Sequence, residues 1–258
     1  MTGEEQARVP IAGRFCQTMA AGFDALWACV DDGMVRIDPA SNSVVAHVAF
    51  DAPRVAGRPA ISPEAVWSLA GDIVADSVVR IDPASNAVTA TLPLGHSVES
   101  LAFGFDALWA TSAADGLLLR IDPATGAVTE HLAGLPTPSG VATGAGSVWL
   151  FRYASNDEPQ YAPGDPVMLR VDPASAETTL VDVGVNPQGY GDIWATDDAV
   201  WVRGIDPVLV RLDPESGAIA WTGVGNEAHG SVGVTFGAVW VTNVEFQTVW
   251  RIDLDQTD

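Results

Sequence analysis

A tryptophan followed by an Arg-apolar-Asp triplet recurs six times along the chain, and this repeat constrains the fold more than any other feature. The tryptophans are Trp27, Trp67, Trp109, Trp149, Trp201 and Trp240. The triplets begin at Arg36, Arg80, Arg120, Arg170, Arg211 and Arg251. Successive tryptophans are 39 to 42 residues apart, except for one interval of 52, and about 40 residues is the period of a four-stranded propeller blade. The repeat therefore predicts six equivalent units, with the tryptophans as core wedges and the Arg-x-Asp pairs as structural links within or between units.

Each copy has the pattern of four short strands, here called A to D in chain order. Residues 140–143, 147–150, 117–121 and 87–92 are examples of the A, B, C and D strands, with apolar or alternating residues and many β-branched side chains. Gly, Asp, Asn and Pro separate the strands, and an Asp-Pro turn joins C to D. No segment has the periodicity of apolar residues that is typical of a helix. The sequence predicts an all-β fold, a six-bladed β-propeller of four-stranded antiparallel blades.

The two ends of the chain predict how the propeller closes. The sixth copy stops after its C strand, near residue 255, and the N-terminal motif Val9-Pro10-Ile11 is similar to Leu92-Pro93-Leu94, which ends a D strand. We therefore expect an N-terminal strand closing the last blade, which removes an open sheet edge. The predicted organisation is one domain over residues 1–258, with blades at about 15–50, 58–94, 98–133, 139–184, 190–224 and 231–255 and a closing strand at 7–12.

Two segments carry a resemblance to known bacterial propellers. Residues 86–95 (Asn-Ala-Val-Thr-Ala-Thr-Leu-Pro-Leu-Gly) and 238–243 (Ala-Val-Trp-Val-Thr-Asn) resemble YVTN-type repeats, and the repeat as a whole is similar to the virginiamycin B lyase group of streptogramin lyases. The resemblance extends over the whole chain. It implies the propeller architecture, but the same architecture supports many functions.

The lyase site itself is not reproduced in this sequence. The resemblance implies a Pro-His start to A strands and a Trp-Phe-Thr-Glu end to B strands, with His and Glu near a magnesium ion. Here one A strand starts with Pro138-Ser139, Glu99 and Val232 stand at the equivalent of the His, and one B strand ends with Thr242-Asn243. His229 is displaced by about three residues from that place. The resemblance therefore does not include the catalytic constellation of the lyases, and a streptogramin-lyase-like lyase or hydrolase stays an alternative.

Charge excludes several classes of partner. The formal net charge is −21, which repels phosphate backbones and anionic lipid surfaces, so we expect no nucleic-acid and no membrane partner. All twelve basic residues are arginine, which excludes Schiff-base lysine chemistry and a Walker-type phosphate site. The expected partner is a small molecule or a peptide, and the expected oligomeric state is a monomer.

The N-terminus and the cysteines bear on location. The first eight residues are polar and acidic, without the basic and apolar regions of a secretory signal, so we expect a cytoplasmic protein, or a secreted one if a signal has been trimmed. Cys16 and Cys29 fall in neighbouring predicted strands, where a disulfide is geometrically allowed. Free cysteines are commonly buried, and the sequence favours two buried thiols.

The residues that break the repeat indicate where a ligand would bind. In an up-and-down blade, the D-to-A and B-to-C connections lie at one end of the strands, and these connections are irregular in length and composition. Arginine, tyrosine and histidine concentrate there, side chains suited to a polar or anionic ligand or a peptide. The alternative is that variable loops gather polar residues without a ligand, since acidic residues crowd the same loops. The candidate ligand-binding residues are Arg14, Arg58, His96, Glu99, Arg152, Tyr153, Tyr190, Asp192, Arg203 and His229.

Catalysis at the end of the blades that carries the D-to-A and B-to-C connections is a second hypothesis. Glu99 with His96 forms a candidate base or metal pair, and His229 is a third catalytic candidate. This hypothesis describes a metal-dependent lyase or hydrolase, with a divalent cation at the channel mouth as its cofactor. A third hypothesis is a non-catalytic protein-interaction scaffold. A long B-to-C insertion at residues 151–166 adds either a lid or a surface flap.

Overall fold

The computed structural model describes most of the chain. The described residues are 9–12, 15–52, 54–71, 75–152, 168–181, 183, 192–204, 209–223, 231–235, 237–243 and 248–254. The chain divides into two compact units, Met1–Leu101 and Ala102–Asp258, and each is described by itself. No helix in the described ranges is long and apolar enough to cross a bilayer.

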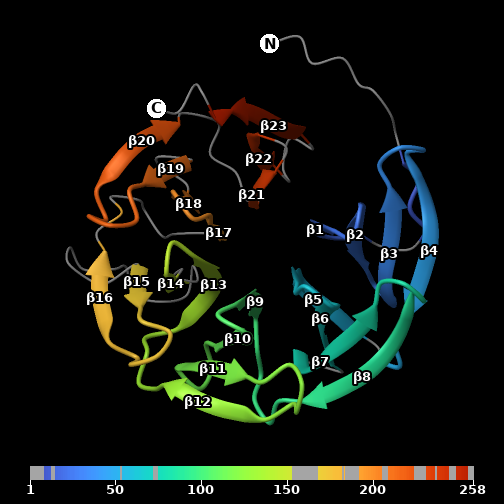
Figure 1. Cartoon of the computed structure of the whole chain (residues 1–258), viewed down its shortest axis with the longest axis horizontal. Helices are drawn as coiled ribbons and strands as arrows, with labels where there is room; N and C mark the ends of the chain where they lie inside the picture. Colours follow the sequence, from blue (N-terminus) through green and yellow to red (C-terminus); the bar gives the residue numbers. More distant parts are fainter. Residues whose placement is uncertain are drawn as a thin grey trace. The chain divides into compact units, whose positions relative to one another are not determined.

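The first unit contains two four-stranded sheets, whose strands are paired in chain order (Figure 1). Blade 1 consists of β1 (Phe15–Gly22), β2 (Ala25–Val30), β3 (Gly33–Asp38) and β4 (Ser43–Ala49). Blade 2 consists of β5 (Arg54–Ile61), β6 (Val66–Gly71), β7 (Ala75–Asp82) and β8 (Ala87–Pro93). All neighbouring strands are antiparallel.

The second unit continues the same meander, with its first strand β9 beginning at the boundary. Blade 3 is β9 (Ser100–Gly104), β10 (Ala107–Ser112), β11 (Leu117–Ile121) and β12 (Val128–Leu132). Blade 4 is β13 (Pro138–Gly144), β14 (Ser147–Arg152), β15 (Met168–Val171) and β16 (Thr178–Val181). Blade 5 is β17 (Asp192–Ala195), β18 (Val200–Arg203), β19 (Leu209–Leu212) and β20 (Ile219–Gly223). The sixth sheet is β21 (Val232–Thr235), β22 (Ala238–Asn243) and β23 (Thr248–Asp253).

The predicted fold class is confirmed: the chain is an all-β protein of the six-bladed β-propeller class, with five four-stranded blades and a last blade of three described strands. The closing strand at 7–12 stays a prediction, because residues 7 and 8 lie outside the described residues and 9–12 form no strand. Val9 and Ile11 nevertheless pack against the B and C strands of blade 1. Val48 and Phe50, at the end of blade 1, pack against the B and C strands of blade 2 in the same way.

The repeated tryptophans are structural, as the sequence predicts. Those of blades 1 to 5 are almost completely buried. The indole N–H also closes the A-to-B hairpin of its own blade: Trp27 donates to Gly22 O at 3.1 Å, and Trp109 to Gly104 O at 2.9 Å. Trp67 donates instead to the Ser62 hydroxyl of its hairpin at 3.0 Å. These tryptophans therefore contribute a large apolar surface and hydrogen-bond to the hairpin of their own blade.

The repeated arginines pair differently from what the sequence suggests. Arg36 lies over the Trp27 ring at 5.5 Å, and its Nη1 donates to Pro83 O of blade 2 at 2.8 Å. Arg170 likewise lies over Trp149 and donates to Pro214 O of blade 5 at 3.1 Å. The links are thus cation–π contacts within a blade and hydrogen bonds to the backbone of the next blade.

The aspartates of the triplets stabilise their own C-to-D turns. In blade 2, Asp82 accepts hydrogen bonds from the N–H of Ala84 at 3.0 Å and from the hydroxyl of Ser85 at 2.6 Å. The Ser85 hydroxyl and then the Ala84 N–H hold the pKa of Asp82 below its ordinary value. In the last blade, Asp253 forms an ion pair with Arg251, which is the pairing that the sequence suggests.

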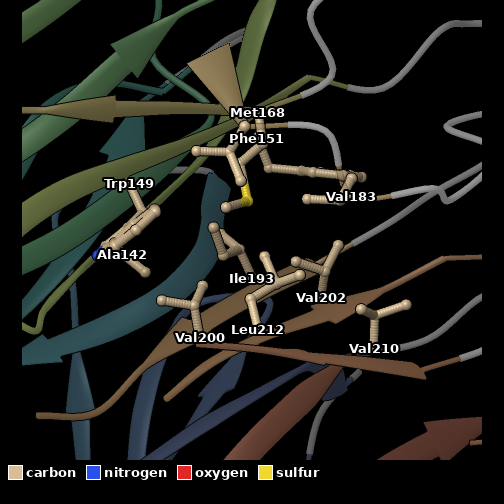
Figure 2. Packing of buried hydrophobic residues seen from close by; sticks show 11 residues of the cluster. Ala142, Trp149, Phe151, Met168, Val183, Ile193, Val200, Val202, Val210 and Leu212 are labelled. Atoms are coloured by element: carbon tan, nitrogen blue, oxygen red, sulfur yellow. The ribbon is translucent and has the colours of Figure 1, made fainter. Parts of the chain in front are cut away.

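Apolar side chains fill the space between neighbouring sheets. Between blades 4 and 5, Trp149, Phe151 and Met168 pack against Ile193 and Val202, and all five are buried (Figure 2). The alternation along β14 and β18 places one set of side chains toward each neighbouring blade. Blades 4 and 5 are therefore held together by an apolar layer.

Cys29 corrects one expectation. Its side chain is fully buried and disulfide-bonded, so the expectation of two free thiols is wrong. Cys16 is the only other cysteine of the chain. Neighbouring antiparallel strands can bring two cysteines within the distance that a disulfide requires, and the frequency with which free cysteines are buried does not take this geometry into account.

Candidate functional site

The candidate site is the loop end of the blades, defined as the end at which A strands begin and B strands end. In the first unit, this end has a paired irregularity. The register of β1 against β2 slips between Phe15 and Met19, and that of β5 against β6 slips between Ala56 and Ala60. The bulges adjoin, because the Thr18 hydroxyl donates to the carbonyl of Gly57 at 2.7 Å. Bulges of this kind redirect side chains and are common beside functional sites.

Arg58, His96 and Glu99 belong to this part of the first unit. Arg58 lies within the β5 bulge, directly after Gly57, which has a left-handed φ of 73°. A Cβ added at Gly57 would lie 3.3 Å from the backbone oxygen of Glu99, so the segment leading to β9 passes close to the bulge. His96 lies in the same segment, and the side chains of Arg58, His96 and Glu99 are all half-buried. The structure thus brings the segments that carry these three candidates together.

In the second unit, blade 4 has a strained residue at its loop end. Thr137 adopts a φ of 38°, although a β-branched side chain strongly disfavours the left-handed region. Arg152, at the end of β14, donates from Nε to the Thr137 hydroxyl at 2.9 Å. The register slips between Pro138 and Gly140, and the bulged Ser139 is buried and donates to Phe151 O at 3.2 Å. Arg152 is therefore held in a fixed position beside a strained turn.

Blade 5 contains a buried arginine beside a half-buried carboxylate at the same end. Asp192, the first residue of β17, lies opposite Arg203, the last residue of β18. Arg203 is completely buried, and it donates to the carbonyl of Gly204. Burial lowers the pKa of Arg203, whereas the negative charge of Asp192 opposes that shift. A guanidinium stays protonated in proteins, so this site holds a buried positive charge.

Asp192 also connects two blades. Its carboxylate accepts the N–H of Ile193 at 2.9 Å and the N–H of Val232, the first residue of β21 in the next blade, at 3.0 Å. The β13 strand packs on β17, and β17 packs on β21, so the loop ends of blades 4 to 6 adjoin. The described part of this end therefore has two arginines, a carboxylate and two hydroxyl side chains on consecutive blades. Such a set can bind an anionic or strongly polar group through charge-assisted hydrogen bonds.

Other candidates lie outside the described residues. These are Arg14, Tyr153, Tyr190 and His229, together with residues 153–166 of the blade 4 insertion. Within the described ranges, no group of three His, Cys, Asp or Glu side chains is arranged to hold a metal ion. Sequence reasoning did not identify Thr137 or Thr18. The signal for Thr137 was its place between Pro136 and Pro138 in a D-to-A connection, whereas Thr18 had no signal in the sequence.

Comparison with known proteins agrees with the fold. The family model described as "Repeat of unknown function (DUF6923)" matches residues 60–156. No curated protein matches the sequence. These findings support a β-propeller repeat family without a specified activity.

Several solved structures are similar to this chain in fold. The hydrazine synthase of Kuenenia stuttgartiensis matches with a TM-score of 0.72 and 11% identity, over 99% of this chain and 80% of the other. The Pan2 WD40 domain of Neurospora crassa matches with a TM-score of 0.67 and 10% identity, over 92% and 75%. BamB from Moraxella catarrhalis matches with a TM-score of 0.57 and 17% identity, over 91% and 71%. At these identities the similarity shows the fold alone: the chain is a β-propeller repeat protein.

Proposed function

We propose that this propeller binds a small polar or anionic ligand, or a peptide, at the loop end of its blades. The observation that carries the proposal is the buried guanidinium of Arg203 beside Asp192 at the loop end of blade 5. Arg152 adds a half-buried guanidinium on the preceding blade. Loops on a rigid β scaffold are a common location for binding sites.

A stability role alone explains this arrangement poorly. Burying a charged group costs several kcal/mol, and an apolar pair of similar volume is often as stable as a buried ion pair. The strained backbone at Thr137 is a further cost, of order 1–3 kcal/mol. Unfavourable features of this kind cluster where a protein binds or reacts, because a ligand then supplies the missing interactions. Both features lie at the end of the blades that breaks the repeat.

We also propose that the chain is related to the YVTN-type and streptogramin-lyase propellers. It is supported by residues 86–95 and 238–243, which carry the similar repeat. The chain differs from the lyases at the positions that would hold their catalytic His and Glu. The resemblance therefore favours binding over lyase chemistry.

The test is a thermal-shift screen of small carboxylates, phosphate esters and short peptides, followed by calorimetric titration of each ligand that raises Tm. We expect Arg152→Gln to weaken binding at least tenfold, because a charge-assisted hydrogen bond is lost. Arg203→Lys keeps the buried charge but removes the planar set of donors, and it should weaken binding similarly.

The matched control is Arg80→Gln, which removes an arginine beside a C-to-D turn at the opposite end of the strands. It should leave the affinity within twofold of the wild type. The proposal is wrong if Arg152→Gln and Arg203→Lys both fold normally and bind every ligand with unchanged affinity.

A further inference from the structure

The outer edge of blade 4 differs from the other described outer edges. The outer D strands β4, β8, β12 and β20 each have a register slip against their neighbour. The pairing of β15 with β16 runs from Met168–Val181 to Val171–Thr178 without any slip. Bulges on edge strands hinder pairing with other chains. Figure 1 shows β16 as the outermost strand of its blade, so this edge lacks a protection that its counterparts have.

A groove lies beside this edge. It has a volume of about 230 Å³ and extends from β16 to the C-to-D turn of blade 5, with Leu180, Val181, Trp149 and Gly217 among its lining residues. Leu180 at the middle of β16 is 63% exposed, the highest value among the large apolar side chains that are exposed in the described residues. The groove is at the opposite end of the strands from Arg152 and Asp192.

At the junction of blades 3 and 4, a histidine of the outer strand reaches the next blade. His131 stands at the slip in the β11–β12 pairing, whereas Val181 pairs directly with Met168. The His131 ring packs edge-to-face against Trp109 with the centroids 4.8 Å apart, and its Nε2 lies 3.5 Å from the carbonyl oxygen of Asp172 in blade 4. Val181 instead contacts the turn of blade 5 through its methyl groups, because a Cβ added at Gly217 would lie 3.0 Å from Val181 Cγ1. The junction of blades 4 and 5 therefore has an apolar contact where the junction of blades 3 and 4 has an imidazole.

The charge around the groove determines which partner fits it. Glu215 lines the groove, and Glu177 and Asp213 are exposed at the adjoining turns. The hydroxyl and then the backbone N–H of Ser216 hold the pKa of Asp213 below its ordinary value, so its carboxylate stays ionised. Arg170, the one cation in the lining, donates to Pro214 O, Glu215 O and the Ser147 hydroxyl. The groove thus presents carboxylates at its rim, while its guanidinium hydrogen-bonds to the wall.

We propose that an extended, basic segment of another protein docks along β16, pairs with it as a fifth strand of blade 4 and places an aliphatic side chain in this groove beside Leu180. Main-chain hydrogen bonds to the edge give affinity in such strand addition, and the side-chain pocket with its surrounding charges gives specificity. A second copy of this chain fits poorly, because two chains of net charge −21 repel each other.

The experiment uses the full chain and three capped nonapeptides labelled with a fluorophore. The first has the sequence RTRVLVRTR, the second has glutamate in place of each arginine, and the third is the basic peptide N-methylated at its central leucine. We expect anisotropy titrations at low salt to show saturable binding of the basic peptide. Binding of the acidic and of the N-methylated peptide should be at least tenfold weaker, because one lacks charge complementarity and the other cannot complete a strand ladder.

Two variants locate the site. Leu180→Ala should weaken binding of the basic peptide about fivefold or more, since it removes the exposed apolar contact. The matched control is Ile219→Ala, which truncates another exposed aliphatic residue on the bulged outer strand β20 and should leave the affinity unchanged. Hydrogen exchange with saturating peptide should slow at the amides of residues 178–181.

The proposal is overturned if the acidic and basic peptides bind equally, if Leu180→Ala binds like the wild type, or if exchange slows at another outer strand instead. Self-association of the chain that Leu180→Ala abolishes would also overturn it, because the occupant would then be a second copy. Circular dichroism of both variants confirms that a change in affinity is not a loss of fold.

Discussion

Arg36 donates a hydrogen bond from Nη1 to the backbone carbonyl of Pro83, 2.8 Å away, and so connects the third strand of blade 1 to the last turn of blade 2. It also donates to Phe23 O at 3.1 Å and lies over Trp27. Because several contacts are lost together, we expect Arg36→Ala to lower the free energy of unfolding by about 2 kcal/mol. Urea unfolding monitored by tryptophan fluorescence measures the change.

Arg80 provides the control for that prediction. It lies over Trp67 in the same way, but its hydrogen bond goes to the Thr89 hydroxyl of its own blade at 3.0 Å. We expect Arg80→Ala to cost about 1 kcal/mol or less. Equal losses for the two variants would show that the bonds between blades contribute nothing beyond the cation–π contact.

The C-to-D turns predict how stability changes with pH. Asp82, stabilised mainly by the Ser85 hydroxyl, has its pKa lowered from 3.8 in the folded chain. A lowered pKa means that the ionised form favours folding, so this contribution is complete above pH 3.8 and is lost as the pH falls toward the folded-state pKa. Chemical unfolding between pH 7 and pH 2.5 should show this loss. Asp82→Asn keeps an acceptor but does not titrate, so its stability should depend less on pH than that of the wild type.

Asp192 is expected to matter for stability as well as for binding. Asp192→Asn removes the negative charge beside the buried Arg203 and places an amide N–H₂ where the carboxylate accepted a backbone N–H. We expect a loss of about 2 kcal/mol, because a half-buried carboxylate that accepts two backbone N–H groups and lies beside Arg203 loses its charge. Adding Arg203→Met in the same chain should recover part of the loss, because the unpaired charge is then removed. Thermal unfolding of the single and double variants tests this, and no recovery in the double variant would contradict the assignment of Asp192 as the counter-charge.

The disulfide of Cys29 gives a further prediction. Reduction of the folded protein should lower the free energy of unfolding by about 2–4 kcal/mol, since the cross-link restricts the unfolded chain. Cys29→Ser should show a similar loss and should no longer respond to reductant. Thiol titration of protein taken directly from its native cells tests the expected cytoplasmic location as well, because disulfides persist mainly in oxidising compartments. Two titratable thiols would agree with the cytoplasm and would contradict the disulfide in vivo.

The repeat predicted the fold because each of its residues has one local role. Trp27 and Asp82 act within their own blade, through a hairpin carbonyl and a turn, and such roles can be inferred from sequence spacing. The partner of Arg36 could not be inferred in this way, since Pro83 is far away in sequence and accepts through its backbone. Backbone acceptors leave no pattern of side chains.

The candidate site was predicted in part, for similar reasons. The end of the blades that carries Arg152, Asp192 and Arg203 follows from topology, and the structure places all three there. The strain at Thr137 and the paired bulges at Thr18 and Gly57 were not predicted, because a bulge is a local insertion in the strand pairing that leaves no distinct pattern of residue types.

The carbonyl acceptors of the arginines have a consequence for the history of the chain. Arg36 and Arg170 hold the following blade by main-chain oxygen atoms, which every amino acid possesses. A duplicated copy of the gene segment that encodes a blade would therefore supply a usable acceptor at its new position without any compensating substitution. Sequence drift in these turns would likewise leave the attachment intact, so ancestral copies could diverge and acquire individual loops while the assembly remained foldable.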